Sequence, residues 1–140
     1  MEVDHSVTDI RRKLQTAGLR PTRQRVALAE LLFAKGDRHL AAEDLHGEAV
    51  VSGVAVSLAT VYNTLHQFTD AGMLRILSVE GSRTYFDTNT SDHHHFYMEE
   101  DGEVVDVPVS TQLKVENLPE PPEGMEVANI DVVIRLRRKR

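Results

Sequence analysis

The chain contains no cysteine and no tryptophan among its 140 residues, and aromatic residues make up only 5% of it. Without cysteine there is no disulfide, and no thiolate can hold a zinc ion or a haem iron. No apolar run approaches the roughly 20 residues that cross a bilayer. The first residues, Met1 to His5, lack the basic and apolar regions of a secretory signal. We therefore expect a cytoplasmic protein with no membrane partner and with nitrogen and oxygen ligands in any metal site.

Charge is distributed unevenly along the chain. The net charge is -6, which at first sight argues against binding to nucleic acid. Residues 1–85, however, carry ten Lys/Arg and ten Asp/Glu, whereas residues 86–140 carry six and twelve. Six basic side chains precede residue 26: Arg11, Arg12, Lys13, Arg20, Arg23 and Arg25. The first half therefore gathers positive charge where a phosphate backbone could meet it.

Helical periodicity and capping residues predict four helices in the first half. The first spans residues 8–17 and the second follows the cap Thr22. The third spans about 41–51 and has no capping side chain at its start, and the fourth lies between Ser57 and Gly72. These amphipathic segments, in a chain that is 41% hydrophobic, are sufficient for a core.

The fourth predicted helix has an unusual polar side. Its apolar side is formed by Leu58, Val61, Leu65 and Phe68, and its polar side by Thr60, Asn63, Thr64 and Gln67. No charged residue occurs from residue 58 to residue 69. Hydroxyl and amide groups are those that read base edges in the DNA major groove. The pattern favours a DNA-reading helix over the alternative, a helix that faces a protein partner.

Two apolar runs, 74–79 and 84–86, flank a turn that contains Gly81 and predict a β-hairpin. Helices followed by this hairpin predict a winged helix-turn-helix, with Arg83 at the hairpin tip against phosphate. The segment after the hairpin has no apolar residue and predicts a hinge. We expect a DNA-binding domain over 1–88, a hinge over 89–92 and a second domain over 93–140.

The second half predicts a small α/β domain. Residues 93–99 and 104–107 flank Asp101-Gly102, a strong hairpin signal. Residues 110–117 suggest a short helix, a proline-rich loop follows, and alternation over 130–136 predicts a half-buried strand. So thin a core favours pairing with a second copy. The fold class is therefore α+β, and a homodimer would place two reading helices on successive turns of DNA.

A run of three histidines marks a candidate ligand site. Because strand side chains alternate, His93 and His95 share a face and His94 points the other way. Imidazoles with nearby carboxylates suit Fe(II), Mn(II) or Zn(II), and imidazole is also an axial ligand of haem iron. Carboxylates nearby in sequence are Asp87, Asp92, Glu99, Asp101 and Asp106. Metal binding at such a site should weaken below about pH 6 as imidazoles take up protons.

Three segments resemble the ferric uptake regulator (Fur) family. They are Gly18-Leu-Arg-Pro-Thr-Arg-Gln-Arg25, His39-Leu-Ala-Ala-Glu-Asp-Leu45, and Leu58-Ala-Thr-Val-Tyr-Asn-Thr-Leu65 with Asp70-Ala-Gly72 after it. The resemblance runs from about residue 10 to residue 107. The Asp87-to-His95 stretch most resembles the iron response regulator (Irr) branch of alpha-proteobacteria, which implies a regulator of iron and haem metabolism genes that responds to haem.

The resemblance also implies roles for individual residues. The implied regulatory metal ligands, which bridge the two domains, are His39, Asp87, His93, His95 and Asp106. The histidines His93, His94 and His95 are the haem candidates. The expected DNA contacts are Arg20, Arg25, Ser57, Thr60, Tyr62, Asn63 and Arg83. The family more often has arginine where Asn63 stands, and asparagine prefers adenine where arginine prefers guanine. The cysteine-held structural zinc of many members should be absent.

Three alternatives stay open. A sensor of Mn(II), Zn(II) or peroxide in the same family would use the same ligands. A small metallohydrolase would need an open metal position and a poised base in a pocket, and no nucleophile motif supports it. A haem or metal carrier that does not bind DNA is disfavoured by the uncharged polar face of the fourth predicted helix.

Overall fold

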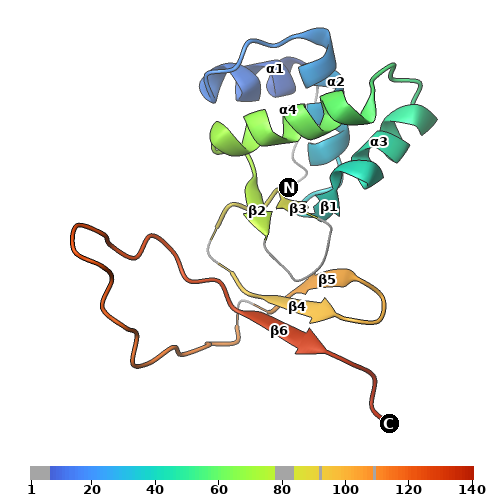
Figure 1. Cartoon of the computed structure of the whole chain (residues 1–140). Coiled ribbons are helices and arrows are strands. Elements are labelled where there is room, and N and C mark those ends of the chain that lie inside the picture. Colours follow the sequence, from blue (N-terminus) through green and yellow to red (C-terminus); the bar gives the residue numbers. More distant parts are fainter. Residues whose placement is uncertain (1–6, 78–83, 92, 109) are drawn as a thin grey trace. The chain divides into compact units, whose positions relative to one another are not determined.

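The computed structural model describes residues 7–77, 84–91, 93–108 and 110–140, and it combines helices with two small sheets in an α+β fold (Figure 1). The chain divides into two compact units, residues 1–90 (unit 1) and 91–140 (unit 2). The predicted turn from Glu80 to Arg83 lies outside the described residues. Among the described helices, none has the length and apolarity that a bilayer crossing requires.

Unit 1 is built around four helices, which are α1 (Val7–Thr16), α2 (Arg23–Phe33), α3 (Ala42–Val51) and α4 (Leu58–Asp70). Their apolar sides meet in one core that includes Leu14, Leu32, Leu45 and Phe68. Burial of each such side chain stabilises the fold by about 1.5–3 kcal/mol. The predicted cap Thr22 accepts a hydrogen bond from the Arg25 backbone N–H at 3.3 Å.

Helix α3 begins in a way that the sequence does not signal directly. Its N-cap is Ala41, which has no capping side chain. The Asp44 carboxylate instead accepts a hydrogen bond from the Ala41 backbone N–H at 3.0 Å. Asp44 also places negative charge in the first turn, where the helix dipole favours it. Asp44, a residue of the first turn, therefore compensates for the missing N-cap side chain.

Helix α4 begins at the predicted cap, because Ser57 Oγ accepts the Thr60 N–H at 3.1 Å. The sequence pattern assigns two residues of α4, Leu58 and Thr64, to the wrong side of the helix. Leu58 is 42% exposed instead of lying in the core, because it occupies the first turn beyond the packed region. Thr64 is buried instead of exposed, and its hydroxyl donates to the Thr60 carbonyl at 2.7 Å, which satisfies the polar group inside the fold.

A three-stranded antiparallel sheet completes unit 1 (Figure 1). Its strands are β1 (His39–Ala41), β2 (Arg75–Leu77) and β3 (Tyr85–Asp87), in the order β1-β3-β2. The β2–β3 pair confirms the predicted strand pairing, with Arg75 opposite Asp87. Strand β1 was not predicted, since three residues carry too short a pattern. It places His39 directly opposite Asp87.

Unit 2 is a second three-stranded sheet, made of β4 (His95–Met98), β5 (Glu103–Asp106) and β6 (Val133–Leu136) in the order β5-β4-β6. The predicted turn joins β4 to β5, with Gly102 at φ +66° donating its N–H to the Met98 carbonyl at 2.8 Å. Strand β6 pairs parallel to β4. The connection over residues 107–132 starts and ends at the same end of the sheet, since the Val107 N–H donates to the His94 carbonyl and the His95 N–H donates to the Val132 carbonyl.

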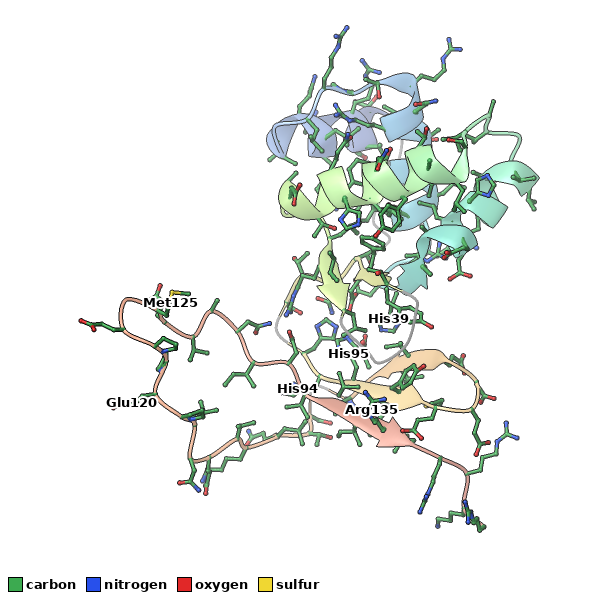
Figure 2. All side chains as sticks on the ribbon, viewed as in Figure 1. His39, His94, His95, Glu120, Met125 and Arg135 are labelled. Atoms are coloured by element: carbon green, nitrogen blue, oxygen red, sulfur yellow. The ribbon has the colours of Figure 1, made fainter. Side chains whose placement is uncertain are left out.

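That connection is irregular, and the helix predicted over 110–117 is wrong, because none of these residues is helical. All of them are exposed except the half-buried Leu113, so the segment has no apolar face to bury, and a short helix without packing is unstable in water. Figure 2 shows Glu120 and Met125 on the part of the loop that extends away from the sheet, and Met125 is 67% exposed.

Candidate metal centre and nucleic-acid interface

Unit 1 carries a pair of candidate metal ligands, His39 and Asp87. They stand opposite each other in the β1–β3 register, and directly opposite residues in an antiparallel pair project from the same face of the sheet. Their ligand atoms lie within 4.8 Å of each other. Backbone hydrogen bonding, and not nearness in sequence, brings the imidazole and the carboxylate together. We name this pair the unit 1 half-site.

Unit 2 carries a second group of candidate ligands, His93, His95 and Asp106. His95 and Asp106 are opposite in the β4–β5 register. The Nε2 atoms of both His93 and His95 lie 3.4 Å from Asp106 Oδ1. The two imidazole rings contact each other with centroids 4.4 Å apart, as expected for side chains two residues apart on one face. We name this group the unit 2 half-site.

The hydrogen bond that His93 makes fixes which nitrogen can bind a metal. Its Nδ1 lies 2.7 Å from the Ser91 carbonyl oxygen. A carbonyl oxygen only accepts, so Nδ1 must carry the proton and donate. The neutral imidazole then has its lone pair on Nε2, the atom that faces Asp106. A backbone carbonyl that orients an imidazole in this way is a common support for metal-binding histidines.

His94, which Figure 2 labels beside His95, makes different contacts from His93 and His95. The Val132 backbone N–H donates to His94 Nδ1 at 3.2 Å. In the neutral imidazole the proton therefore sits on Nε2, which cannot then donate a lone pair to a metal. Val132 lies just before β6, and its carbonyl accepts a hydrogen bond from the His95 N–H at 3.1 Å. His94 thus fastens the start of β6 to β4.

The chemistry of the two half-sites fits a divalent metal ion. The donors are imidazole nitrogens and carboxylate oxygens, which suit Fe(II), Mn(II) and Zn(II) and do not select Cu(I). Each half-site combines a histidine with an aspartate whose position is set by strand register. The ligands therefore lie on sheets that already hold them in place, which reduces the entropy lost when a metal binds.

Helix α4 presents an exposed side that carries polar groups. Tyr62 is 43% exposed, and Asn63 and Gln67 are also exposed. Two other predicted contact residues bond to each other, since Ser57 Oγ donates to Thr60 Oγ1 at 2.9 Å. This side of α4 can offer amide and hydroxyl groups to base edges.

Arg25, a predicted DNA contact, is held against α4. Its guanidinium donates to Gln67 Oε1 at 3.1 and 3.3 Å and to the Arg20 carbonyl at 3.0 Å. Arg20 itself is exposed. The structure therefore places the Arg25 guanidinium next to the exposed side of α4, and the Arg20 backbone carbonyl next to that guanidinium. Arg83, the remaining predicted contact, lies outside the described residues.

An aromatic cluster, which sequence reasoning missed, joins α4 to β3. The His66 ring lies 4.5 Å from Tyr62 and 5.3 Å from Phe86, centroid to centroid, and both contacts are edge-on. Phe86 is fully buried and directly precedes Asp87. Such pairs add about 0.5–1.5 kcal/mol beyond burial. No sequence signal links residues 62 and 86, because the contact depends on the tertiary packing of the sheet on the helices.

Comparison with known proteins gives the same assignment as the motifs. The model of the ferric uptake regulator family matches residues 16–135. The chain belongs to the ferric uptake regulator family. It is 38% identical over 92 residues to a ferric uptake regulation protein of Shigella flexneri. It is 36% identical over 101 residues to one of Vibrio parahaemolyticus.

The match to the Shigella flexneri protein covers 66% of this chain and 62% of that protein. The match to the Vibrio parahaemolyticus protein covers 71% of this chain and 68% of that protein. The chain thus spans less than two thirds of the length of the first of these relatives. A solved ferric uptake regulator of Pseudomonas aeruginosa with manganese superposes with a TM-score of 0.72 at 26% identity, and the alignment covers 94% of this chain and 98% of that one.

Proposed function

We propose that this chain is a metal-responsive transcription regulator that binds double-stranded DNA, and that it is not an enzyme. Unit 1 would be a winged helix-turn-helix domain with α4 as its reading helix. The observation that carries the proposal is the presence of one register-paired half-site in each unit. Family membership and the likeness to a manganese-containing ferric uptake regulator support it.

The metal would be held jointly by the two half-sites. His39 and Asp87 would come from unit 1, and His93, His95 and Asp106 from unit 2. An ion bound by both would fix the angle between the units, and a ligand that favours one angle favours one position of α4. When bound, the ion supplies positive charge that holds the carboxylates together. The chain's own residues orient the imidazoles, as the Ser91 carbonyl does for His93.

DNA recognition would use the exposed side of α4 together with the basic residues beside it. Asn63 and Tyr62 would contact base edges, Arg20 would enter the minor groove, and Arg25 would be a further DNA contact. Unit 2 would pair with a second copy, because three short strands bury little apolar surface. A two-fold homodimer would present two α4 helices to successive turns of the duplex.

We further propose that the protein belongs to the iron response regulator branch and regulates genes of iron and haem metabolism, with haem as an effector. A cavity of about 560 Å³ in unit 2 favours this. Its lining mixes apolar residues such as Val107 and Leu113 with the polar residues Thr111 and Gln112 and with the imidazoles of His93 and His94, and ligand sites commonly combine apolar walls with a few polar groups. Because His93 Nε2 is also a candidate metal ligand, haem iron and the divalent metal would compete for it. Haem would therefore release DNA.

The test is fluorescence anisotropy of a labelled duplex selected from a random pool, measured without ligand and with Mn(II), Fe(II), Zn(II) or haem. Metal should tighten binding and haem should weaken it, and His93→Ala with His95→Ala should remove both effects. His46→Ala, a histidine of α3 outside both half-sites, is the control. Sequence-independent binding, or none, would support a carrier. A response to Mn(II) or Zn(II) without a haem effect would identify a sensor of another signal, and peroxide is then added to the metal-loaded protein.

A further inference from the structure

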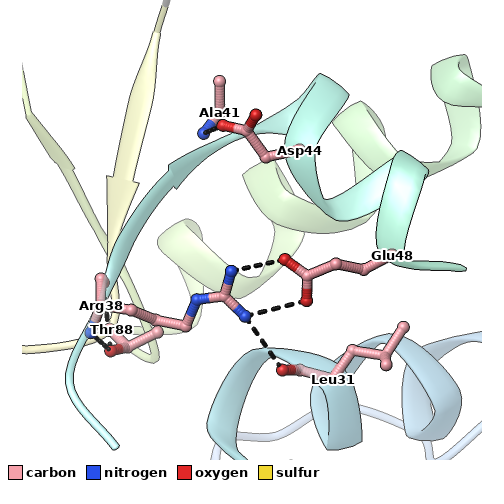
Figure 3. A network of polar contacts seen from close by, with 6 residues as sticks. All are labelled: Leu31, Arg38, Ala41, Asp44, Glu48 and Thr88. Atoms are coloured by element: carbon pink, nitrogen blue, oxygen red, sulfur yellow. Dashed lines mark hydrogen bonds and ion pairs between the residues drawn. The ribbon is translucent and has the colours of Figure 1, made fainter. Parts of the chain in front are cut away.

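Arg38 stands at a junction of three parts of unit 1 (Figure 3). Its guanidinium donates to both carboxylate oxygens of Glu48 in α3, at 2.9 and 2.5 Å. The same group donates to the Leu31 carbonyl of α2 at 3.3 Å. That carbonyl lies in the last turn of α2, where carbonyls lack helical partners and a cation is favourable. One side chain therefore joins α2 and α3.

The backbone of Arg38 is fastened to the segment that follows β3. Its N–H donates to Thr88 Oγ1 at 2.9 Å, and its carbonyl accepts the Thr88 N–H at 3.0 Å. Arg38 directly precedes His39, and Thr88 directly follows Asp87. The residues that flank the unit 1 half-site are thus hydrogen-bonded to each other, one step beyond the ligands.

The Arg38–Glu48 ion pair can couple the position of the unit 1 half-site to the position of α3. The two side chains are only 18% and 25% exposed, and two-point contact between guanidinium and carboxylate fixes orientation as well as distance. Helix α3 in turn packs on α4, since Leu45 and Ala49 lie in the same core cluster as Val61 and Leu65. The path from half-site to reading helix therefore runs through hydrogen-bonded residues and then through the packed core.

We infer that Arg38 is a positioning residue, which through Glu48 links the His39–Asp87 half-site to α3 and so makes DNA affinity depend on metal occupancy. This inference rests on the proposed function. An ion pair that served the fold alone would lower stability when removed and would leave the response to metal unchanged. The two roles are therefore separable by measurement.

The experiment compares the full-length protein with Arg38→Gln, Glu48→Gln and the double variant. Mn(II) affinity is measured by calorimetry, and duplex affinity by anisotropy with and without Mn(II). Each single variant should bind Mn(II) about tenfold more weakly, the effect expected when support of a metal ligand is lost. The increase in duplex affinity on adding Mn(II) should also fall several-fold. The double variant should be no worse than either single one, because the two residues act as one unit.

Lys114→Gln is the matched control, since it removes an ion pair with Glu116 whose side chains are 83% and 62% exposed. If Arg38→Gln does not fold, as judged by circular dichroism, Thr88→Val replaces it. That variant removes the 2.9 Å contact with the Arg38 N–H and should also weaken Mn(II) binding.

Two outcomes overturn the inference, and they can be told apart. If the unaltered protein responds to Mn(II) and the folded variants respond equally, the inference is wrong and the proposed function stands. If the unaltered protein binds DNA without any response to Mn(II), Fe(II) or Zn(II), both are wrong.

Discussion

Replacing His94 with alanine should weaken unit 2 and leave metal binding intact, whereas His95→Ala should strongly weaken metal binding. The two residues are neighbours in the sequence, so any difference between the effects of the two substitutions comes from where the fold places each side chain. His94 Nδ1 accepts the Val132 N–H at 3.2 Å. His95 instead directs Nε2 to within 3.4 Å of Asp106. The two variants therefore test whether alternation along the strand gives His94 a structural role and His95 a ligand role.

The magnitudes follow from these contacts. Removing the His94 imidazole leaves the Val132 N–H without its acceptor, and a hydrogen bond of this kind contributes about 0.5–1.5 kcal/mol net. Because Val132 is only half-buried, water can partly replace the acceptor, and we expect a loss of about 1 kcal/mol, or about fivefold in the folding equilibrium. His95→Ala removes a ligand itself, so Mn(II) affinity should fall by more than the 10–100-fold typical of supporting residues.

Three measurements check this prediction. Calorimetry with Mn(II) gives the affinity, urea unfolding gives the stability, and amide hydrogen exchange at Val132 reports the lost hydrogen bond directly. His46→Ala, a histidine of α3 outside both half-sites, controls for loss of an imidazole elsewhere. If His94→Ala loses Mn(II) binding to the same extent as His95→Ala, the assignment of roles within the histidine run is refuted.

Three further predictions concern unit 1. The hydrogen-bonded Arg38 guanidinium lowers the pKa of Glu48 in the folded protein. The stabilisation that the ion pair gives is therefore complete above the unfolded-state pKa of about 4.3, and it is lost as pH falls through the lower folded-state pKa. In urea unfolding, the difference in unfolding free energy between the unaltered protein and Glu48→Gln should close only below about pH 4. Asn63→Arg should shift one operator position from adenine to guanine, by about 1–3 kcal/mol in discrimination, as read by selection from random duplexes. Ser57→Ala should cost about 1 kcal/mol of unfolding free energy in urea through the lost cap of α4.

The elements that the sequence predicts well are those with a local signal. Thr22 and Ser57 cap α2 and α4 because a hydroxyl reaches a backbone N–H three residues away. The Asp101-Gly102 turn sets the β4–β5 register, and that register brings His95 opposite Asp106. Period two likewise places His93 beside His95. These parts of the fold and of the candidate site need no knowledge of distant contacts.

The parts that escape prediction depend on distant partners. Strand β1 exists because β3, more than forty residues later, offers a hydrogen-bonding edge. The role of His94 depends on Val132, 38 residues away. The Arg38–Glu48 pair crosses from one element to another and leaves no periodic trace. Thr64 occupies the core because its hydroxyl finds a carbonyl within its own helix, which a division into polar and apolar residues cannot register.

Fixing candidate ligands by strand register has a consequence for how such sites vary. His39 and Asp87, like His95 and Asp106, are paired across hydrogen-bonded ladders, so residues can be gained or lost between the strands without separating the pair. A slip of one residue within a ladder, by contrast, turns a ligand to the opposite face. Family members are therefore better compared by which residues stand opposite each other than by the number of residues between histidines.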